Sequence, residues 1–393
     1  MSKFLYITPF FKYPPTDGAS LRSVNLFEIL CEQYDVELLT YDYDGILKFK
    51  ESMKNNLKIH FLTSKFETSK SLSFFQRLFS KTLSGFASHN PISISIDINS
   101  LVEENKDYDY YYFATQLMGQ SVLIKKQKGI HIIDLYDVYT TYSKNKYSKI
   151  PFWRPYYWLF RLEAYRIKLF EKKIIENFDQ VLVTCKENMH SINNLCKGKS
   201  LIEVPNGVNI PTTIQEQNKA LTILMVANFE YSGNNEGIKW FYKHVWQIII
   251  DKIHNAKLVL VGKCPSDIRT MTKNENNITI TGIVPSLTEF YEKAACVILP
   301  LFNDGGTKTK LLEAMAYGKP IVSTREGAKG FKNMNSITIT NDPKIFASSV
   351  SSILINGIDD GTLDKSRQLI HNHYTWDKIG DKLNNLISTM TKA

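Results

Sequence analysis

The stretch that decides the fold is residues 296–318, CVILPLFNDGGTKTKLLEAMAYG. Its first four residues, Cys296–Leu299, are apolar and of the length of a short buried strand, and a turn with two glycines follows. Residues Lys308–Tyr317 then have the apolar spacing of a helix. A strand that leads through a glycine turn into a helix is the repeating unit of a parallel sheet. This stretch therefore predicts an α/β fold.

The same alternation of short strands and amphipathic helices extends through both halves of the chain. In the first half the expected strands are Phe4–Thr8, Val36–Thr40, Lys58–Leu62, Tyr108–Phe113, Ile130–Leu135, Gln180–Thr184 and Leu201–Val204. In the second half they are Leu221–Val226, Lys257–Val261, Ile278–Thr281, Cys296–Leu299, Pro320–Ser323 and Ser336–Thr340. Two such cycles predict two Rossmann-like domains.

A polar stretch at residues 211–219 separates the two cycles and has the composition of a linker. We therefore expect an N-terminal domain over residues 1–210 and a C-terminal domain over residues 211–374. The last segment, residues 375–393, contains Trp376–Met390, whose apolar residues repeat at helical spacing. This helix can pack on either domain, including back on the N-terminal one.

Composition limits the classes of protein to which the chain can belong. Its five cysteines lack the short spacings of zinc sites and disulfide frameworks, which predicts a reducing compartment. No run of 18 apolar residues occurs, and the N-terminus does not have the pattern of a signal peptide. We therefore expect a cytoplasmic protein that does not span a membrane and has no nucleic-acid partner.

The net charge of +9 is concentrated in one segment. Residues 144–173 contain nine basic and two acidic side chains, interleaved with aromatic ones. One interpretation is a peripheral contact with the inner face of a membrane. The other is a long helix with an apolar core face and solvated charges. The sequence leaves both interpretations open.

The loop before Lys308–Tyr317 has the features of an anion site. The backbone N–H groups of Gly305, Gly306 and Thr307 lie at a helix N-terminus, where the helix dipole favours negative charge. Lys308 and Lys310 add positive charge in the first turn, which a bound anion would compensate. The alternative is an ordinary junction between a loop and a helix, with solvated lysines.

Helical spacing places Gly306, Lys310, Glu313 and Tyr317 on one face of the predicted helix. Glu313 lies about 10 Å along the axis from the anion end, by the helical rise per residue. A carboxylate at that distance can accept hydrogen bonds from the ribose of a nucleotide whose phosphates occupy the loop.

Residues 310–324, KLLEAMAYGKPIVST, resemble the donor-site segment of family 4 glycosyltransferases with the GT-B fold. Three other stretches resemble the same family in the same order, namely residues 204–209, residues 226–231, and residues 261–262 followed by 280–284. The resemblance implies two Rossmann-like domains that face each other across a cleft. It also implies retaining transfer of a sugar from a nucleotide-activated donor, without a metal or another cofactor. The implied acceptor is a glycan or lipid-linked glycan of capsule, O-antigen or lipopolysaccharide biosynthesis.

The resemblance also suggests further site residues. In PPTDGASLR, residues 14–22, Gly18 permits a tight turn near a ligand and Arg22 faces the cleft, although an ordinary turn with a surface arginine would have the same pattern. In IDLYDV, Asp134 and Asp137 lie at a strand's carboxyl end, where they are catalytic candidates together with Lys310 or simple caps of the following turn.

Two further residues complete the expected donor site. Asn228 follows the first strand of the second domain, in the stretch that resembles the family. Glu326 follows the strand Pro320–Ser323 and could line the nucleobase side of the site or belong to a plain turn.

The chain departs from the family pattern at Gly305, where many relatives have a first glutamate that contacts the donor sugar and precedes the ribose-binding one. We expect backbone amides of residues 305–307 to hold the donor instead. The Arg and Lys that clamp the diphosphate in many relatives are also not evident, so Lys308 and Lys310 are assigned that task.

Other functions remain as alternatives. An inverting GT-B transferase, a sugar-nucleotide epimerase and a non-catalytic membrane-associated protein share parts of the pattern. A dinucleotide-dependent oxidoreductase is disfavoured, because neither candidate turn has the Gly-x-Gly-x-x-Gly spacing. Asp107 and Asp109 imitate a metal-binding pair but lie at the start of a strand, so we expect no metal site there.

Overall fold

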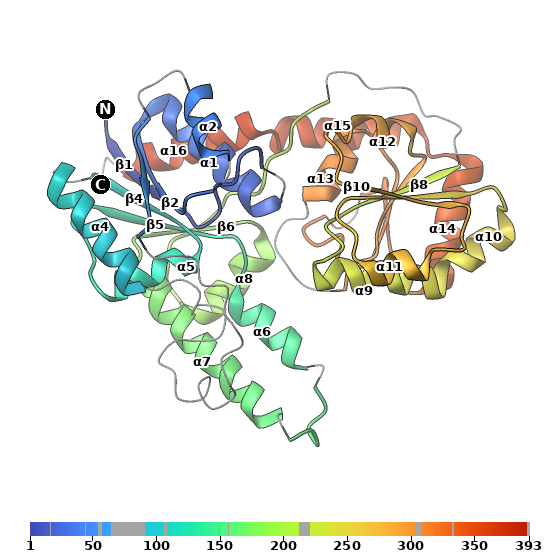
Figure 1. The fold of residues 1–393 in the computed structure, drawn as a ribbon, viewed down its shortest axis with the longest axis horizontal. Coiled ribbons are helices and arrows are strands. Elements are labelled where there is room, and N and C mark those ends of the chain that lie inside the picture. The colour runs from blue at the N-terminus through green and yellow to red at the C-terminus, as the bar shows by residue number, and fades with distance from the viewer. Residues whose placement is uncertain are drawn as a thin grey trace. The chain divides into compact units, whose positions relative to one another are not determined.

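The computed structural model describes residues 1–15, 17–43, 45–53, 57–63, 91–105, 108–148, 150–155, 157–211, 221–302, 309–331 and 334–390. The chain forms two compact units (Figure 1). Unit 1 consists of Met1–Pro205 together with Gly380–Ala393, and unit 2 consists of Asn206–Ile379. Each unit is built on one parallel sheet with helices, so the α/β fold class predicted from the sequence is confirmed.

Within the described residues, unit 1 has a seven-stranded sheet in the order β3-β2-β1-β4-β5-β6-β7. Its strands are β1 (Lys3–Ile7), β2 (Asp35–Thr40), β3 (Ile59–Phe61), β4 (Tyr110–Ala114), β5 (Ile130–Leu135), β6 (Gln180–Val183) and β7 (Leu201–Glu203). Its helices are α1 (Gly18–Gln33), α2 (Ile46–Ser52), α4 (Pro91–Asn105), α5 (Gln116–Gly119), η1 (Gln120–Leu123), α6 (Tyr139–Ser148), α7 (Tyr157–Glu176) and α8 (Lys186–Leu195).

The described part of unit 2 has a six-stranded sheet in the order β10-β9-β8-β11-β12-β13. Its strands are β8 (Thr222–Val226), β9 (Lys257–Val261), β10 (Ile278–Gly282), β11 (Cys296–Leu299), β12 (Ile321–Ser323) and β13 (Ile337–Ile339). Its helices are α9 (Ser232–Phe241), the π-helical η2 (Tyr242–Trp246), α10 (Gln247–Lys252), α11 (Ser266–Met271), α12 (Thr288–Lys293), α13 (Thr309–Ala316), α14 (Pro343–Asn356) and α15 (Asp360–His373).

In each sheet the strand order reverses at an internal pair of strands. In unit 1 the order reverses between β1 and β4, and in unit 2 it reverses between β8 and β11. In doubly wound sheets, ligands bind outside the carboxyl ends of the strands at this point. The topology therefore directs attention to the residues that follow β1, β8 and β11.

The central strands of unit 2, β8 and β11, are apolar along almost their whole length because both faces of the sheet are covered by helices. Ile223 and Met225 of β8 belong to a core with α9, η2, α10 and α14. Leu224 and Val226 point to the other face and belong to a core with α12, α13 and α15. Continuous apolar runs of this kind are why the strand positions could be predicted from the sequence.

Aromatic residues form part of the core of unit 1. Phe4 and Tyr6 of β1 stack on Tyr110 and Tyr112 of the neighbouring β4, with ring centroids 4.4 and 4.7 Å apart. Alternate residues of both strands, including Leu5 of β1, point to the opposite face. The aromatic pairs bury large apolar areas and place tyrosine hydroxyl groups inside the unit.

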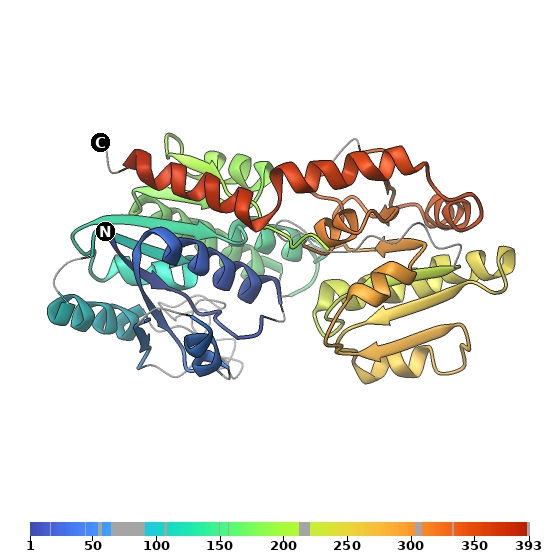
Figure 2. The same cartoon turned by 90° about the horizontal axis from the view of Figure 1, so that it is seen from above.

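The last helix, α16 (Trp376–Met390), begins in unit 2 and continues as part of unit 1 from Gly380 onward (Figure 2). A Cβ added to Gly380 would lie 3.1 Å from a methyl group of Ile29, so α16 packs closely on α1. The chain therefore enters unit 2 once and returns to unit 1 at its end.

Candidate functional site

The exit of β11 is tightly packed at the carboxyl edge of the unit 2 sheet. A Cβ added to Gly237 of α9 would clash with the carbonyl oxygen of Pro300, and one added to Gly327 would clash with that of Leu299. The Thr324 hydroxyl also donates to the carbonyl oxygen of Leu301. Glycine at these two positions thus lets α9 and the turn after β12 approach the backbone that leads to the predicted anion loop.

Four residues of that loop, Gly305, Gly306, Thr307 and Lys308, lie outside the described residues. Their assignment to the donor stays a prediction. The structure does describe the strand before the loop and the helix α13 after it, and α13 carries two other predicted donor residues, Lys310 and Glu313.

Glu313 is held in place by two neighbours. The Lys310 Nζ atom lies 3.0 Å from each carboxylate oxygen of Glu313, and the hydroxyl of Tyr291 on α12 donates to Oε2 at 3.0 Å. Burial, together with the charge of Glu313, raises the pKa of Tyr291 well above its usual value, so this hydroxyl keeps its proton. The Glu313 side chain is still 17% exposed. Its carboxylate is therefore held in place by the protein, and part of the side chain is exposed.

Tyr317 lies on the same face of α13 as Lys310 and Glu313. Its ring stacks on Tyr291 with centroids 4.6 Å apart, and its hydroxyl shares a 2.9 Å hydrogen bond with Thr288. These contacts fix α13 against α12 next to the Glu313 carboxylate.

Asn228 and Glu326 lie at the same edge of the sheet. Asn228 is exposed directly after β8, where its Oδ1 atom accepts a 3.0 Å hydrogen bond from the backbone of Glu230. Glu326 follows β12 and accepts a 3.4 Å hydrogen bond from Asn341, which follows β13. Asn228 is therefore at the switch point, whereas Glu326 is displaced toward the edge strand.

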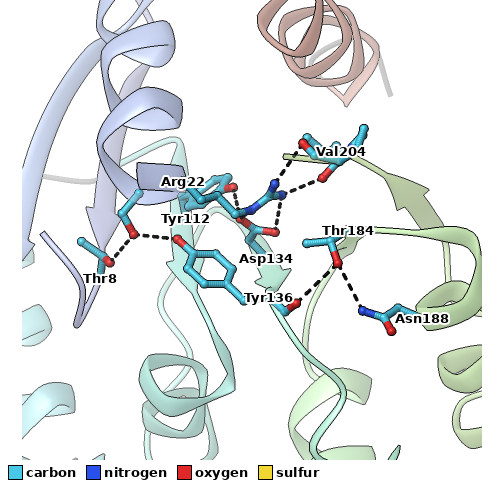
Figure 3. A network of polar contacts seen from close by, with 10 residues as sticks. Thr8, Arg22, Tyr112, Asp134, Tyr136, Thr184, Asn188 and Val204 are labelled. Atoms are coloured by element: carbon cyan, nitrogen blue, oxygen red, sulfur yellow. Dashed lines mark hydrogen bonds and ion pairs between the residues drawn. The ribbon is translucent and has the colours of Figure 1, made fainter. Parts of the chain in front are cut away.

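The corresponding edge of unit 1 contains a buried ion pair (Figure 3). Arg22 donates from Nε and Nη2 to the two carboxylate oxygens of Asp134, at 2.8 Å each, and Tyr112 donates to Asp134 Oδ2 at 2.9 Å. Arg22 also donates to the carbonyl oxygens of Val204 at 2.8 Å and Pro205 at 3.1 Å.

This arrangement corrects the expected orientation of Arg22. Both Arg22 and Asp134 are buried and form an ion pair with each other, and Arg22 also binds backbone carbonyls. Burial opposes the charge of Arg22, but the carboxylate of Asp134 raises the pKa of the guanidinium above its usual value. In this conformation the pair anchors the fold and does not present either group to a substrate.

A second set of hydrogen bonds lies beside this ion pair, where the Arg22 guanidinium is 5.5 Å from the centre of the Tyr136 ring (Figure 3). Ser23 shares hydrogen bonds with Thr8 at 3.0 Å and with the Tyr136 hydroxyl at 2.6 Å. On the other side, Thr184 donates to the backbone oxygen of Tyr136 at 3.4 Å and accepts from Asn188 at 3.2 Å. These residues were not predicted from the sequence, because single hydroxyl groups have no spacing that distinguishes them from surface ones.

Asp137, the second carboxylate predicted after β5, is exposed. Its backbone oxygen accepts a 2.7 Å hydrogen bond from the Gln116 side chain, which also donates to the buried Glu171 at 2.8 Å. Glu171 further accepts from the backbone N–H groups of Tyr139 and Thr140, at 2.8 and 2.9 Å, and so caps α6. Glu171, which was not predicted from the sequence, thus holds the turn that carries Asp137 in place through Gln116.

Gly18 is the exposed first residue of α1. The side chain of Asp17 caps this helix by accepting from Ala19 N at 3.0 Å and Ser20 N at 2.9 Å. Gly18 therefore lies at the carboxyl edge of β1, at the switch point of the unit 1 sheet.

Two structural observations bear on metals and membranes. No group of three or more His, Cys, Asp and Glu side chains in the described residues is placed to hold a metal ion. Asp109 accepts a hydrogen bond from the backbone of Lys3 at 2.8 Å, and Asp107 lies outside the described residues. Among the described helices, none has the length and apolar content needed to cross a bilayer.

Comparison with known sequences finds a family match within unit 2. Residues 220–356 match the family described as glycosyl transferases group 1, which confirms the resemblance seen in residues 310–324. The chain is also similar to an uncharacterized 44.6 kDa protein in the cps region of Klebsiella pneumoniae, with 22% identity over 370 residues. That alignment covers 89% of this chain and 90% of the relative.

Solved structures with similar folds are glycosyltransferases of the GT-B type. Sucrose-phosphate synthase from Thermosynechococcus elongatus aligns with a TM-score of 0.74 and 15% identity, over 100% of both chains. Anabaena HepE in complex with UDP-glucose aligns with a TM-score of 0.68 and 10% identity, over 99% of this chain and 100% of that one. At such low identity the likeness shows the fold, and the predicted GT-B architecture is confirmed.

Proposed function

We propose that this chain, which carries a group 1 glycosyltransferase sequence over residues 220–356, transfers a sugar from a nucleotide-activated donor to a glycan or lipid-linked glycan. The observation that carries the proposal is the Glu313 carboxylate, held by Tyr291 and Lys310 on the helix that follows the switch-point strand β11. The cps-region relative and HepE, solved with UDP-glucose, support a role in polysaccharide biosynthesis with such a donor.

Glu313 has the properties needed to bind the ribose of the donor. An ionised carboxylate can accept hydrogen bonds from two neighbouring hydroxyl groups. Tyr291 and Lys310 hold its two oxygens in position before the ligand arrives, so binding requires little reorganisation. The Lys310 ammonium is also in the first turn of α13, close to where the phosphates of the same nucleotide would lie.

The chemistry at the phosphate end follows from this placement. Negative charge builds up on the leaving diphosphate as the glycosidic bond breaks. We assign its stabilisation to the backbone amides of Gly305–Thr307, to Lys308 and to Lys310, which act more strongly on the transition state than on the ground state. From the family resemblance we also propose that the transfer requires no metal ion and proceeds with retention of the anomeric configuration, in a cytoplasmic enzyme.

On the acceptor side, the two candidate carboxylates differ in their burial. Asp134 is buried against Arg22, whereas Asp137 is exposed on the turn that follows the strand. We therefore assign the substrate-facing role to Asp137, with Gly18 at the neighbouring edge of β1.

A donor screen tests the proposal. Purified protein is incubated with UDP-, GDP- and other nucleotide sugars, and release of the nucleotide is compared for wild type and Glu313→Ala. The control is Glu289→Ala on α12, which removes an exposed glutamate that pairs with Lys293. We expect at least one donor to be turned over, with a loss of about 100-fold for Glu313→Ala and none for the control.

Equal nucleotide release by wild type and Glu313→Ala for every donor would contradict the proposed site. Assignment of the product anomer by NMR then separates a retaining from an inverting transferase. Circular dichroism of both variants shows whether a loss of activity reflects a loss of structure.

A further inference from the structure

Helix α7 has large apolar side chains on two opposite faces. Ile167, Ile174 and Ile175 are buried in the core of unit 1. On the other face, Trp158, Leu162, Tyr165 and Leu169 are 73%, 45%, 57% and 49% exposed. Their spacing of four, three and four residues places them in one line along the helix. We call these four residues the α7 stripe.

Basic residues lie on both sides of the α7 stripe. At about 100° per residue, Arg161, Lys168 and Lys172 fall along one side, and Arg166 and Lys173 fall along the other. Arg161, Lys168, Lys172 and Lys173 are exposed. The stripe is therefore an apolar band between two rows of cations.

The acidic residues of α7 do not neutralise this face. Glu171 is buried and caps α6, and Glu163 points to the opposite side of the helix by its position in the helical turn. Glu176, at the end of the helix, lies 3.6 Å from Lys172. The face therefore keeps a positive charge.

A second exposed apolar group lies just before the helix. Phe152 and Trp153 are each 70% exposed, and their rings pack edge to face with centroids 5.1 Å apart. Figure 1 shows α6 and α7 as a hairpin that projects from the sheet of unit 1, with the segment between the two helices at its far end. The aromatic pair is thus at the tip of the projection, next to the beginning of the α7 stripe.

We propose that the α7 stripe and the aromatic tip bind the surface of a bilayer that contains anionic phospholipids. Several exposed apolar side chains in one continuous band mark an interaction surface, whereas single exposed ones do not. A helix with an apolar band between rows of cations lies in the interface of a membrane, with the apolar side chains among the acyl chains and the cations at the phosphates. Trp and Tyr favour this depth, because one end of each ring is apolar and the other can form hydrogen bonds.

The charge pattern favours lipid over another protein as the occupant. Interfaces between proteins have few charged residues near their apolar centre, and Lys in particular is depleted there. Here Lys168, Lys172 and Lys173 flank the C-terminal half of the apolar band, and Arg161 and Arg166 flank its N-terminal half. Cations on both sides of the band match a continuous layer of anionic headgroups. None of the residues in this surface is assigned to the donor or to the reaction, so the inference does not depend on either.

Co-sedimentation of the full-length protein with vesicles tests the inference. The vesicles consist of phosphatidylcholine alone or of phosphatidylcholine with 30% phosphatidylglycerol. We expect binding to the anionic vesicles, weaker binding to the neutral ones, and a shift of tryptophan emission to shorter wavelength on binding. The shift is expected because Trp153 and Trp158 are exposed, whereas Trp246 and Trp376 are already buried.

Two sets of variants separate the apolar and the electrostatic contributions. The apolar set is Trp158→Ser with Leu162→Ser and Tyr165→Ser, and its control is Ile345→Ser with Ile355→Ser, which removes exposed apolar side chains of α14. The charge set is Arg161→Gln with Lys168→Gln and Lys172→Gln. Its control, Lys243→Gln with Lys252→Gln and Lys257→Gln, removes three exposed cations of unit 2.

We expect the charge set to weaken binding to anionic vesicles on the order of 100-fold, from roughly fivefold for each cation, and the apolar set to abolish the emission shift. Both controls should bind like the wild type. Unchanged binding of the apolar set, or no binding of the wild type, overturns the inference. A different result also overturns the inference: the wild type forms a concentration-dependent dimer in sedimentation velocity and does not bind vesicles, and the apolar set removes this dimer. The stripe is then an interface between two copies of the chain.

Discussion

Arg22 and Asp134 form a bidentate ion pair inside unit 1, although 112 residues separate them in the sequence. The same guanidinium binds the backbone oxygens of Val204 and Pro205, the last residues of the first segment of unit 1. One side chain of α1 therefore joins β5 to the segment that leaves β7. Removal of either charge would leave the other buried without its partner, which is the main physical cost in such pairs.

Asp134→Ala should lower the free energy of unfolding of unit 1 by about 3–5 kcal/mol, because it leaves the Arg22 guanidinium buried and unpaired. Urea denaturation followed by circular dichroism measures this change. The double variant Arg22→Met with Asp134→Leu removes both charges and should be less destabilised than the single variant. If Asp134→Ala instead unfolds like the wild type but is inactive, Asp134 acts on the substrate and not on the fold.

Tyr291→Phe should weaken donor binding more than it lowers kcat. The substitution removes the 3.0 Å hydrogen bond to Glu313 Oε2 and keeps the ring that stacks on Tyr317. The loss of one such bond to a charged group corresponds to roughly a tenfold rise in KM, by its typical energy of about 1.5 kcal/mol. Steady-state kinetics with the donor identified in the screen measure KM and kcat separately. A fall in kcat at constant KM would show that Tyr291 acts in the transition state only.

Glu37 should make stability depend on pH in acid solution. Burial alone would raise the pKa of this carboxyl, but hydrogen bonds from Tyr108, His60, Lys58 and Lys3 lower it from 4.5 to about 2. Because the folded-state pKa is depressed, the stabilisation is complete above about pH 4.5 and is lost as the pH falls through about 2. It amounts to at most about 3 kcal/mol. Urea denaturation between pH 2 and 6 should show a flatter profile for Glu37→Gln, and equal slopes for both proteins would refute this origin.

His131 should also make stability depend on pH, in a higher pH range than Glu37 and for a different reason. Burial lowers its pKa from 6.5 to about 4, although Gly129 accepts a hydrogen bond from the ring. The unfolded chain binds a proton below pH 6.5 and the folded chain does not until about pH 4, so stability decreases as the pH falls across this window. His131→Phe, which keeps the stacking on Tyr111, should remove the pH dependence between 6.5 and 4. Thermal unfolding at a series of pH values measures the effect, and an unchanged profile in the variant would assign the dependence to another group.

The sequence was a good guide to the secondary structure of both units. Each strand expected from an apolar run is present, and its ends differ from the prediction by at most two residues, as for Tyr110–Ala114 in place of Tyr108–Phe113. Helix α16 has the predicted bounds, Trp376–Met390. Local patterns suffice here because both faces of the sheets are covered, so most strand residues are apolar.

The role of the basic and aromatic segment could not be decided from the sequence. Its pattern is equally consistent with an aromatic core face and with an exposed one, since the spacing of apolar residues does not show which of two faces is covered. The structure shows that the isoleucines of α7 supply the core contacts and that Trp158 and Tyr165 stay exposed.

The sequence by itself determined the α/β class, the two cycles of strands and helices, and the resemblance of residues 310–324, because each depends on neighbouring residues. Only the tertiary structure decided that Arg22 is paired with Asp134 inside unit 1 and that Tyr291 and Lys310 fix Glu313. A side chain's exposure and its partners depend on which distant segments pack beside it, and Arg22 and Asp134 meet only because β1 and β5 flank β4 in the same sheet.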